Sequence, residues 1–143
     1  MGVANKQLQR IERAGDSGTM SDKYFIRPVF RVRNVAASVA YYCEKLGCRK
    51  RWEHGADGPI IAEVERGDLS VILDSGSVVP KPGGPSVLTL SVEKLIELHR
   101  EFVERGANIV TPLFEVVWQE NTYQFDVEDL DGNILVFWGD KPA

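Results

Sequence analysis

The sequence has few of the residues from which metal centres and disulfide scaffolds are built. It contains two cysteines and two histidines among 143 residues. Cys43 and Cys48 are too few for a disulfide framework and do not have the spacing of a CxxC redox or zinc motif, so we expect two free thiols. His54 ends an expected strand and His99 lies within an expected helix. We interpret both histidines as structural residues rather than as metal ligands.

Long apolar runs and an excess of positive charge are also missing. No stretch approaches the ~18 consecutive apolar residues of a membrane span, and no apolar segment typical of a signal peptide is seen. The 17 Lys and Arg are outnumbered by 21 Asp and Glu, which gives a net charge of −4, and the only basic run is residues 49–51. Nucleic-acid phosphates require clustered positive charge. We therefore expect a cytoplasmic protein that binds neither nucleic acid nor membranes.

The composition that remains is typical of one globular domain. Hydrophobic residues make up 43% of the chain and charged residues 27%, and a chain of this length can bury one sizeable core without cross-links. Residues 1–22 have no sustained pattern and are predicted to form a flexible tail, in which Met20 is an alternative start. The folded domain is expected over residues 23–143.

Within that domain, one order of secondary structure occurs twice. Residues 24–74 and residues 86–139 each predict a strand, a helix and three further strands. The segment between them, residues 75–85, is rich in Gly, Pro and Ser and is interpreted as a linker. The repetition indicates two similar modules rather than a single irregular fold.

Local signals predict where the elements begin and end. Asn34 is a plausible helix N-cap, and Gly47 and Gly106 are placed as the glycines that end the two helices. Pro28 lies inside the first expected strand, residues 24–32. Because proline has no N–H to donate, this strand is predicted to be at an edge or to change partners.

Three stretches of the chain also follow a family pattern. The first runs from Arg27 to Gly47 and includes the helix end Lys45-Leu46-Gly47. The second is Leu90–Leu95, and the third is Phe125–Asn133, which ends in Leu130-Asp131-Gly132-Asn133. In order and spacing they resemble the vicinal-oxygen-chelate superfamily, also called the glyoxalase/bleomycin-resistance/dioxygenase superfamily. The chain departs from that pattern with Cys48 in place of Phe and Leu130 in place of Pro.

The resemblance implies an α+β fold of two βαβββ modules, with curled mixed sheets that form a cleft and helices packed on the outside. In many members two chains pair and the cleft lies between modules of different chains, so a homodimer is also implied. Pro28 is similar to a proline that is associated, in the bleomycin-resistance proteins, with exchange of the first strand between chains.

Enzymes of this superfamily mostly hold a divalent metal through His, Gln or Glu. Here the corresponding positions are Arg27, Pro85 or Ser86, and Val136, and none is a good ligand. The resemblance therefore favours a metal-free protein of the bleomycin-resistance type, without a cofactor, that binds or sequesters a small molecule. The alternative is a glyoxalase-like lyase, isomerase or dioxygenase with atypical ligands, or acid/base catalysis by Glu63 or Asp126.

Aromatic and polar side chains of both modules are expected to line the cleft. Trp52 matches a position that stacks on the drug in bleomycin-binding proteins, whereas Asn121 stands where those proteins have a stacking tryptophan. We expect a planar or aromatic ligand, neutral or cationic, between Trp52 and Trp138. Arg27 could neutralise Asp126, or bind an anionic group and reverse the charge preference. The candidate ligand-binding residues are Arg27, Trp52, Glu63, Asn121, Gln124, Asp126 and Trp138.

Overall fold

The computed structural model describes residues 22–76 and 84–141, and its elements repeat in the predicted order. Module 1 contains β1 (Val29–Arg31), α2 (Val35–Leu46), β2 (Arg49–His54), β3 (Ile61–Arg66) and β4 (Leu69–Asp74). Module 2 contains β5 (Val87–Ser91), α3 (Leu95–Arg105), β6 (Ile109–Glu115), β7 (Thr122–Glu128) and β8 (Ile134–Asp140). The α+β fold of two βαβββ modules is confirmed. The tail predicted over residues 1–22 and most of the predicted linker lie outside the described residues.

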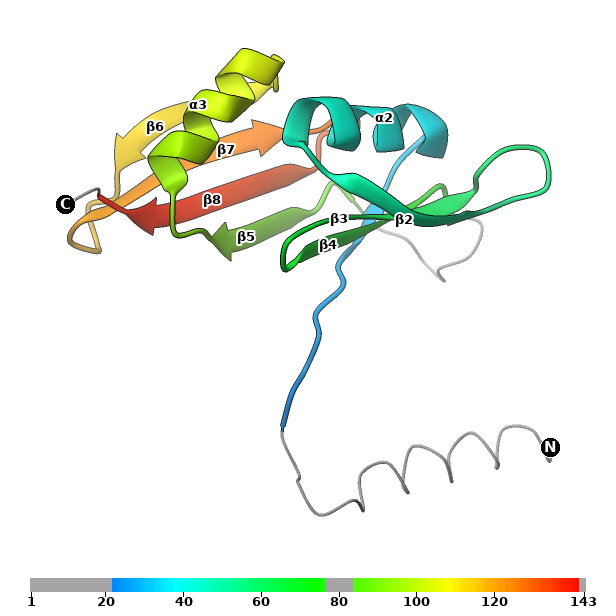
Figure 1. The fold of residues 1–143 in the computed structure, drawn as a ribbon, viewed down its shortest axis with the longest axis horizontal. Helices are drawn as coiled ribbons and strands as arrows, with labels where there is room; N and C mark the ends of the chain where they lie inside the picture. The colour runs from blue at the N-terminus through cyan, green and yellow to red at the C-terminus, as the bar shows by residue number, and fades with distance from the viewer. Residues whose placement is uncertain (1–21, 77–83, 142–143) are drawn as a thin grey trace.

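Each module forms one mixed sheet. The strand orders are β1-β4-β3-β2 and β5-β8-β7-β6, in which β1 and β5 run parallel to their neighbours and the other pairs are antiparallel. Figure 1 shows α2 and α3 on the same side of the two sheets. The opposite side of each sheet, which we call its open face, has no helix among the described residues. Neither α2 nor α3 is long and apolar enough to cross a membrane.

The core lies between the helices and the covered faces of the sheets. Along β3, Ala62 and Val64 are buried against the helix layer, whereas Glu63 between them points to the open face. In module 2, Phe102 of α3 packs edge-on against Phe125 and Phe137, with ring centroids 5.9 and 5.3 Å apart. The predicted alternation of strand residues therefore separates a covered apolar face from an open face of mixed polar, aromatic and aliphatic residues in both modules.

The caps of α2 are those that the sequence predicts. The Asn34 side chain accepts a hydrogen bond from the Ala37 N–H at 3.0 Å, and Gly47 ends the helix at a φ of 67°. A side chain at Gly47 would also clash with the guanidinium of Arg66. That guanidinium is the far end of a flexible side chain and can move, so glycine is favoured at this position mainly by its left-handed backbone conformation.

The first strand is shorter than predicted. The sequence indicates a strand over residues 24–32, but β1 contains only Val29–Arg31. The carbonyl of Pro28 still accepts a hydrogen bond from the Ile72 N–H at 2.8 Å, and residues 22–27 pair with no strand in the described structure. Residues 22–27 form an extended segment, which we call the N-terminal arm, that leaves the molecule on the open side of the sheets (Figure 1).

A turn between β7 and β8, residues 129–133, is held by its own side chains. The Asp129 carboxylate accepts hydrogen bonds from the backbone N–H groups of Asp131 and Asn133, at 2.8 and 3.0 Å, and from the Asn133 side chain at 2.9 Å. Gly132 within the turn has a φ of 83°. We call this segment the β7–β8 turn.

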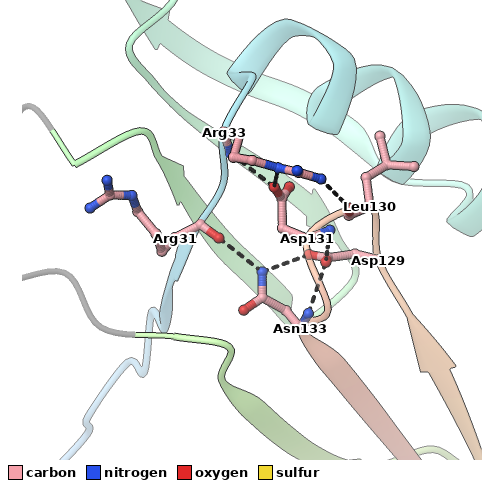
Figure 2. Close-up of polar contacts among 6 residues, drawn as sticks. All are labelled: Arg31, Arg33, Asp129, Leu130, Asp131 and Asn133. Carbon is pink, nitrogen blue, oxygen red and sulfur yellow. Dashed lines mark hydrogen bonds and ion pairs between the residues drawn. The ribbon is translucent and has the colours of Figure 1, made fainter.

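The same turn joins module 2 to module 1 (Figure 2). The Asn133 side chain donates to the carbonyl of Arg31 at 3.1 Å, and the Arg33 side chain donates to Asp131 at 3.1 Å. From α2, the buried Tyr42 hydroxyl donates to Asp129 at 2.8 Å. The β7–β8 turn therefore fixes β1 and α2 of module 1 against the sheet of module 2.

Loss of the Tyr42 hydroxyl is expected to weaken this junction. In Tyr42→Phe, the buried Asp129 carboxylate loses one of its donors, and the free energy of unfolding should fall by about 1–3 kcal/mol. Chemical denaturation at a fixed protein concentration measures this change. Tyr123→Phe is the matched control, because no hydrogen bond of its hydroxyl is found in the described structure. Equal effects of the two substitutions would contradict the role given to Tyr42.

A second junction is ionic. Arg66, at the end of β3, donates to both carboxylate oxygens of Glu101 on α3 at 2.5 and 2.8 Å, and to the carbonyl of Leu46 at 3.0 Å. Arg105 donates to the same carboxylate at 2.9 Å. The hydrogen bonds from Arg66, followed by those from Arg105, lower the pKa of Glu101 to about 2.

This lowered pKa predicts a loss of stability in acid. A carboxyl group whose pKa is lower in the folded state stabilises the fold above its unfolded pKa of about 4.3 and loses that contribution as the pH falls towards 2. Glu101→Gln should therefore reduce the free energy of unfolding near neutral pH, and the difference from the parent protein should vanish near pH 2. Glu104→Gln, on the same helix and without an ion pair, should show no such pH-dependent difference. A constant difference for Glu101→Gln across this range would contradict the assignment.

Candidate functional site

Glu63 is at the centre of the open face of module 1. Its two carboxylate oxygens accept separate hydrogen bonds, one from Arg27 at 3.1 Å and one from Arg51 at 3.0 Å. The Glu63 side chain is 0% exposed, whereas the side chains of Arg27 and Arg51 are 53% and 55% exposed. The carboxylate is thus covered by the two guanidinium groups, which themselves face solvent.

A β-bulge places two residues of β2 opposite Glu63. Lys50 pairs with Val64 and Trp52 pairs with Glu63, so that Arg51 is the extra residue between them. Arg51 reaches the Glu63 carboxylate, and Trp52 is opposite Glu63 in the strand register with 36% of its surface exposed. The bulge therefore brings a guanidinium and an indole to the same carboxylate.

Sequence reasoning missed Arg51. The predicted cleft does not include the basic run that contains it, and an uninterrupted strand would direct Arg51 and Trp52 to opposite faces. The bulge changes that alternation. The only available sequence signal was the run itself, in which Arg51 directly precedes the candidate Trp52.

On the open face of module 2, two candidate residues face each other across a strand pair. Gln124 of β7 is paired with Trp138 of β8, and the Gln124 side-chain N–H donates to Asp126 at 3.0 Å. The Trp138 ring lies against Trp118, with centroids 5.9 Å apart. The Trp138 Nε1 and the Gln124 Oε1 are buried without a hydrogen-bond partner in the described structure.

Trp118, rather than the candidate residue Asn121, lies beside Trp138. Asn121 lies in the exposed turn before β7 at a φ of 56°, and its carbonyl accepts from the Lys141 N–H at 2.7 Å. Trp118, which the candidate list omitted, supplies the second indole of module 2. Trp118 is three residues before Asn121, so the sequence leaves open whether it replaces the stacking tryptophan, and the path of the β6–β7 connection brings it to Trp138.

The candidate residues form two separate groups. One group is on module 1 and the other on module 2, and no hydrogen bond, ion pair or ring contact joins the two groups among the described residues. Within one chain Arg27 pairs with Glu63, and no ion pair between Arg27 and Asp126 is found among the described residues. The module 1 group contains Arg27, Trp52 and Glu63, and the module 2 group contains Asn121, Gln124, Asp126 and Trp138.

The match to known families agrees with the fold. Residues 25–137 match the model of the Glyoxalase/Bleomycin resistance protein/Dioxygenase superfamily. The chain belongs to this superfamily. The family resemblance that the sequence indicates is thereby confirmed, over the same part of the chain.

Several solved structures of low sequence identity share the superfamily fold. TioX from Micromonospora sp. ML1 is 22% identical, with a TM-score of 0.70 over 82% of this chain and 99% of its own. A glyoxalase/bleomycin resistance protein/dioxygenase from Alicyclobacillus acidocaldarius has a TM-score of 0.64 at 15% identity, covering 85% and 95% of the two chains. A glyoxalase-related enzyme from Clostridium phytofermentans has a TM-score of 0.63 at 17% identity, covering 87% and 99%. No curated protein sequence matches significantly.

The divalent metal of many superfamily enzymes does not fit the residues of this member. Arg27 presents a cationic guanidinium already bonded to Glu63, and Val136 on β8 has no donor atom. Pro85 and Ser86 precede β5, and the Ser86 N–H donates to the Asn133 side chain. Among residues 22–76 and 84–141, no three His, Cys, Asp or Glu side chains form a metal-binding group. No chemical step through a metal is therefore derived for this site.

A large hollow in this superfamily member lies between its modules. About 1000 Å³ of space separates the β3–β4 hairpin and β4 from β5, and it is lined in part by Ile26, Leu69, Leu88 and Leu90. Neither the Trp52–Glu63 group nor the Trp138 group lines it. Trp138 lines a smaller hollow of about 260 Å³ together with Thr122 and Gly139.

Proposed function

We propose that this superfamily member binds and sequesters a planar or aromatic small molecule, without a metal ion, in a cleft that two chains form together. The observation that carries the proposal is the chemistry of the residues at the metal-ligand positions. A guanidinium, a valine and a proline-serine pair cannot replace His, Gln and Glu as donors. Because those positions lack metal ligands, the surface is suited to stacking contacts with a ligand rather than to Lewis-acid catalysis.

Indole rings on both open faces support binding by stacking. Trp52 is partly exposed on module 1, and Trp118 and Trp138 are paired on module 2. Flat ligands gain roughly 0.5–1.5 kcal/mol from such an aromatic contact beyond area burial. If the open face of module 1 meets the open face of a partner's module 2, one ligand contacts indoles from two directions.

The charges of the two faces are complementary. On module 1, the two arginines outnumber the Glu63 carboxylate that they share, whereas the module 2 group contains Asp126 and no basic residue. A positive face therefore attracts the negative face of a second chain, which favours this pairing over contact of two like faces. A two-fold arrangement would form two such clefts.

The N-terminal arm supports the second chain independently. Tyr24, Phe25 and Ile26 are 83%, 88% and 80% exposed, which is unusual for three consecutive large apolar side chains. Burial of each would contribute roughly 1.5–3 kcal/mol. The arm leaves the chain on the side of the open faces, where a partner would lie (Figure 1).

Acid/base catalysis is the second candidate function, and Asp126 is its best-placed residue. Both oxygens of Glu63 accept from arginines, so neither is directed at a substrate. Asp126 is partly exposed on the open face, and within the described part of the chain one of its oxygens accepts a hydrogen bond, from Gln124. Asp126→Asn separates the two candidates, since it should abolish catalysis but leave the stacking of a neutral ring in place.

Metal content and binding of a flat neutral probe together test the main proposal. Elemental analysis of protein purified without chelators should find far less than one equivalent of divalent metal. Naphthamide, followed by NMR at the tryptophan indole N–H signals, should bind the parent protein about tenfold or more tightly than Trp52→Ala. Near one equivalent of nickel, zinc, iron or manganese, lost on substitution of cleft residues, would overturn the metal-free function. Equal naphthamide affinities of the parent protein, Trp52→Ala and Trp138→Ala would contradict the stacking cleft.

Replacement of the arm's apolar residues is expected to weaken the dimer. A variant with Tyr24, Phe25 and Ile26 all changed to Ser should raise the dimer dissociation constant by about tenfold or more, because the buried apolar area is lost. Sedimentation velocity over a range of concentrations measures this constant. Val103→Ser, an exposed valine on the outer face of α3, is the control and should leave it unchanged. A parent protein that stays monomeric at micromolar concentration would refute the intermolecular cleft.

A further inference from the structure

The open face of module 1 contains a charge arrangement that the proposed stacking function does not explain. Glu63 is fully buried, yet it neutralises only one of the two arginines that cover it. We call Arg27, Glu63 and Arg51 the arginine clamp. Its formal charge is +1 in a chain whose net charge is −4, so the local charge is opposite in sign to that of the whole protein.

Most hydrogen-bonding capacity of the clamp is unused. A guanidinium has five N–H donors in a planar fork, and Arg27 and Arg51 each donate one recorded hydrogen bond, to Glu63. No other carboxylate within the described residues pairs with either arginine. Because more than half of each side chain is exposed, the remaining donors are accessible from the open face.

Glu63 fixes the positions of the two guanidinium groups. Each arginine bonds a different oxygen of the same carboxylate, at 3.1 and 3.0 Å, so one buried anion anchors both guanidinium groups. A rigid pair of guanidinium groups loses less side-chain freedom on binding than two free arginines. The buried carboxylate therefore positions the two arginines and is not itself a contact for a cationic ligand.

The neighbouring arginine of β2 shows what distinguishes the clamp. Arg49 is on the same strand and pairs with Glu65, but this is a one-to-one ion pair with no surplus charge. The bulge residue Arg51 instead joins a carboxylate that Arg27 already neutralises, and Trp52 stands opposite the same carboxylate. Of the two carboxylates that pair with arginines of β2, Glu63 is therefore the one that has both surplus positive charge and an exposed indole beside it.

We propose that the arginine clamp binds a carboxylate or similar oxyanion attached to a flat ring that stacks on Trp52. This assignment rests on the proposed small-molecule function and specifies its ligand class as an aromatic anion. Of the alternatives that the sequence left open, it corresponds to the one in which Arg27 binds an anionic group, so that an anionic ligand is preferred to a cationic one. The module 2 face, with Asp126 and the paired indoles, would contact the rest of the ring system.

Two probes of the same shape and different charge test the clamp in the full chain. Naphthoate and naphthamide are titrated in parallel and followed by NMR at the tryptophan indole and arginine Nε–H signals. Naphthoate should bind about tenfold or more tightly than naphthamide, because charged hydrogen bonds are stronger than neutral ones. Signals of Arg27, Arg51 and Trp52 should shift together with naphthoate. Raising the salt concentration should weaken naphthoate binding more than naphthamide binding.

Substitutions then assign the effect to the clamp. Arg51→Gln and Arg27→Gln should each reduce naphthoate affinity about tenfold, to near that of naphthamide, and leave naphthamide affinity unchanged. Arg49→Gln is the matched control and should change neither affinity by more than about twofold. Thermal unfolding of each variant is measured, because Glu63 loses a partner in the first two. The comparison of the two probes on the parent protein does not depend on how any variant folds.

The outcomes separate this inference from the function on which it rests. Equal affinity of the two probes, with both weakened by Trp52→Ala, would overturn the anion site and leave the stacking function intact. Tighter naphthoate binding that is unchanged in Arg27→Gln and Arg51→Gln would also overturn the clamp, since the anion would bind elsewhere. If neither probe shifts the Trp52 signal at about 10 mM, both the clamp and the stacking cleft are wrong.

Discussion

The buried polar turn between β7 and β8 holds the two modules in one arrangement. Asp129 organises the turn through backbone N–H groups, and Tyr42 and Asn133 extend it to α2 and β1 of module 1. Each module alone is a four-stranded sheet with one helix, and the strands of the two sheets do not pair within the described residues. Hydrogen bonds that are buried and satisfied specify a single geometry, because any shift leaves charged or polar groups unpaired. The Asp-Gly-Asn part of the family pattern is therefore explained in this chain by module assembly rather than by ligand chemistry.

That arrangement has a consequence for the open faces. With both helices on the same side, no helix of the described residues covers the opposite side of either sheet, which carries polar, aromatic and some aliphatic residues. Trp52 and the Arg27–Glu63 pair lie on one sheet, whereas Trp138 lies on the other. A site that uses residues of both groups at once needs the faces to meet, and the proposed dimer would bring them together without a change in either module. The exposed apolar arm and the opposite charges of the two faces act in the same direction.

A structural feature of this protein can be predicted from its sequence when one short segment determines that feature. Helix ends at Asn34 and Gly47 follow from capping and from backbone conformation, both of which one short segment determines. The separation of covered and open faces follows from strand alternation. The length of β1 cannot be predicted in this way, because residues 24–27 have strand-forming side chains but no neighbouring strand among the described residues. Arg51 and Trp118 were missed for a related reason, since a bulge in β2 and the path of the β6–β7 connection place them.

The bulge also shows why net charge is a poor guide to the ligand of this site. A negative chain suggests a cationic ligand when carboxylates are counted, and Glu63 is one of the carboxylates expected in the cleft. Its burial beneath two arginines removes it from the accessible surface, and the charge that remains exposed there is positive. Long-range attraction depends on the whole molecule, but at contact distance the nearest unsatisfied donors dominate. One additional residue in β2 is therefore sufficient to change the charge that the open face of module 1 presents to a ligand, with no change in the composition of the chain.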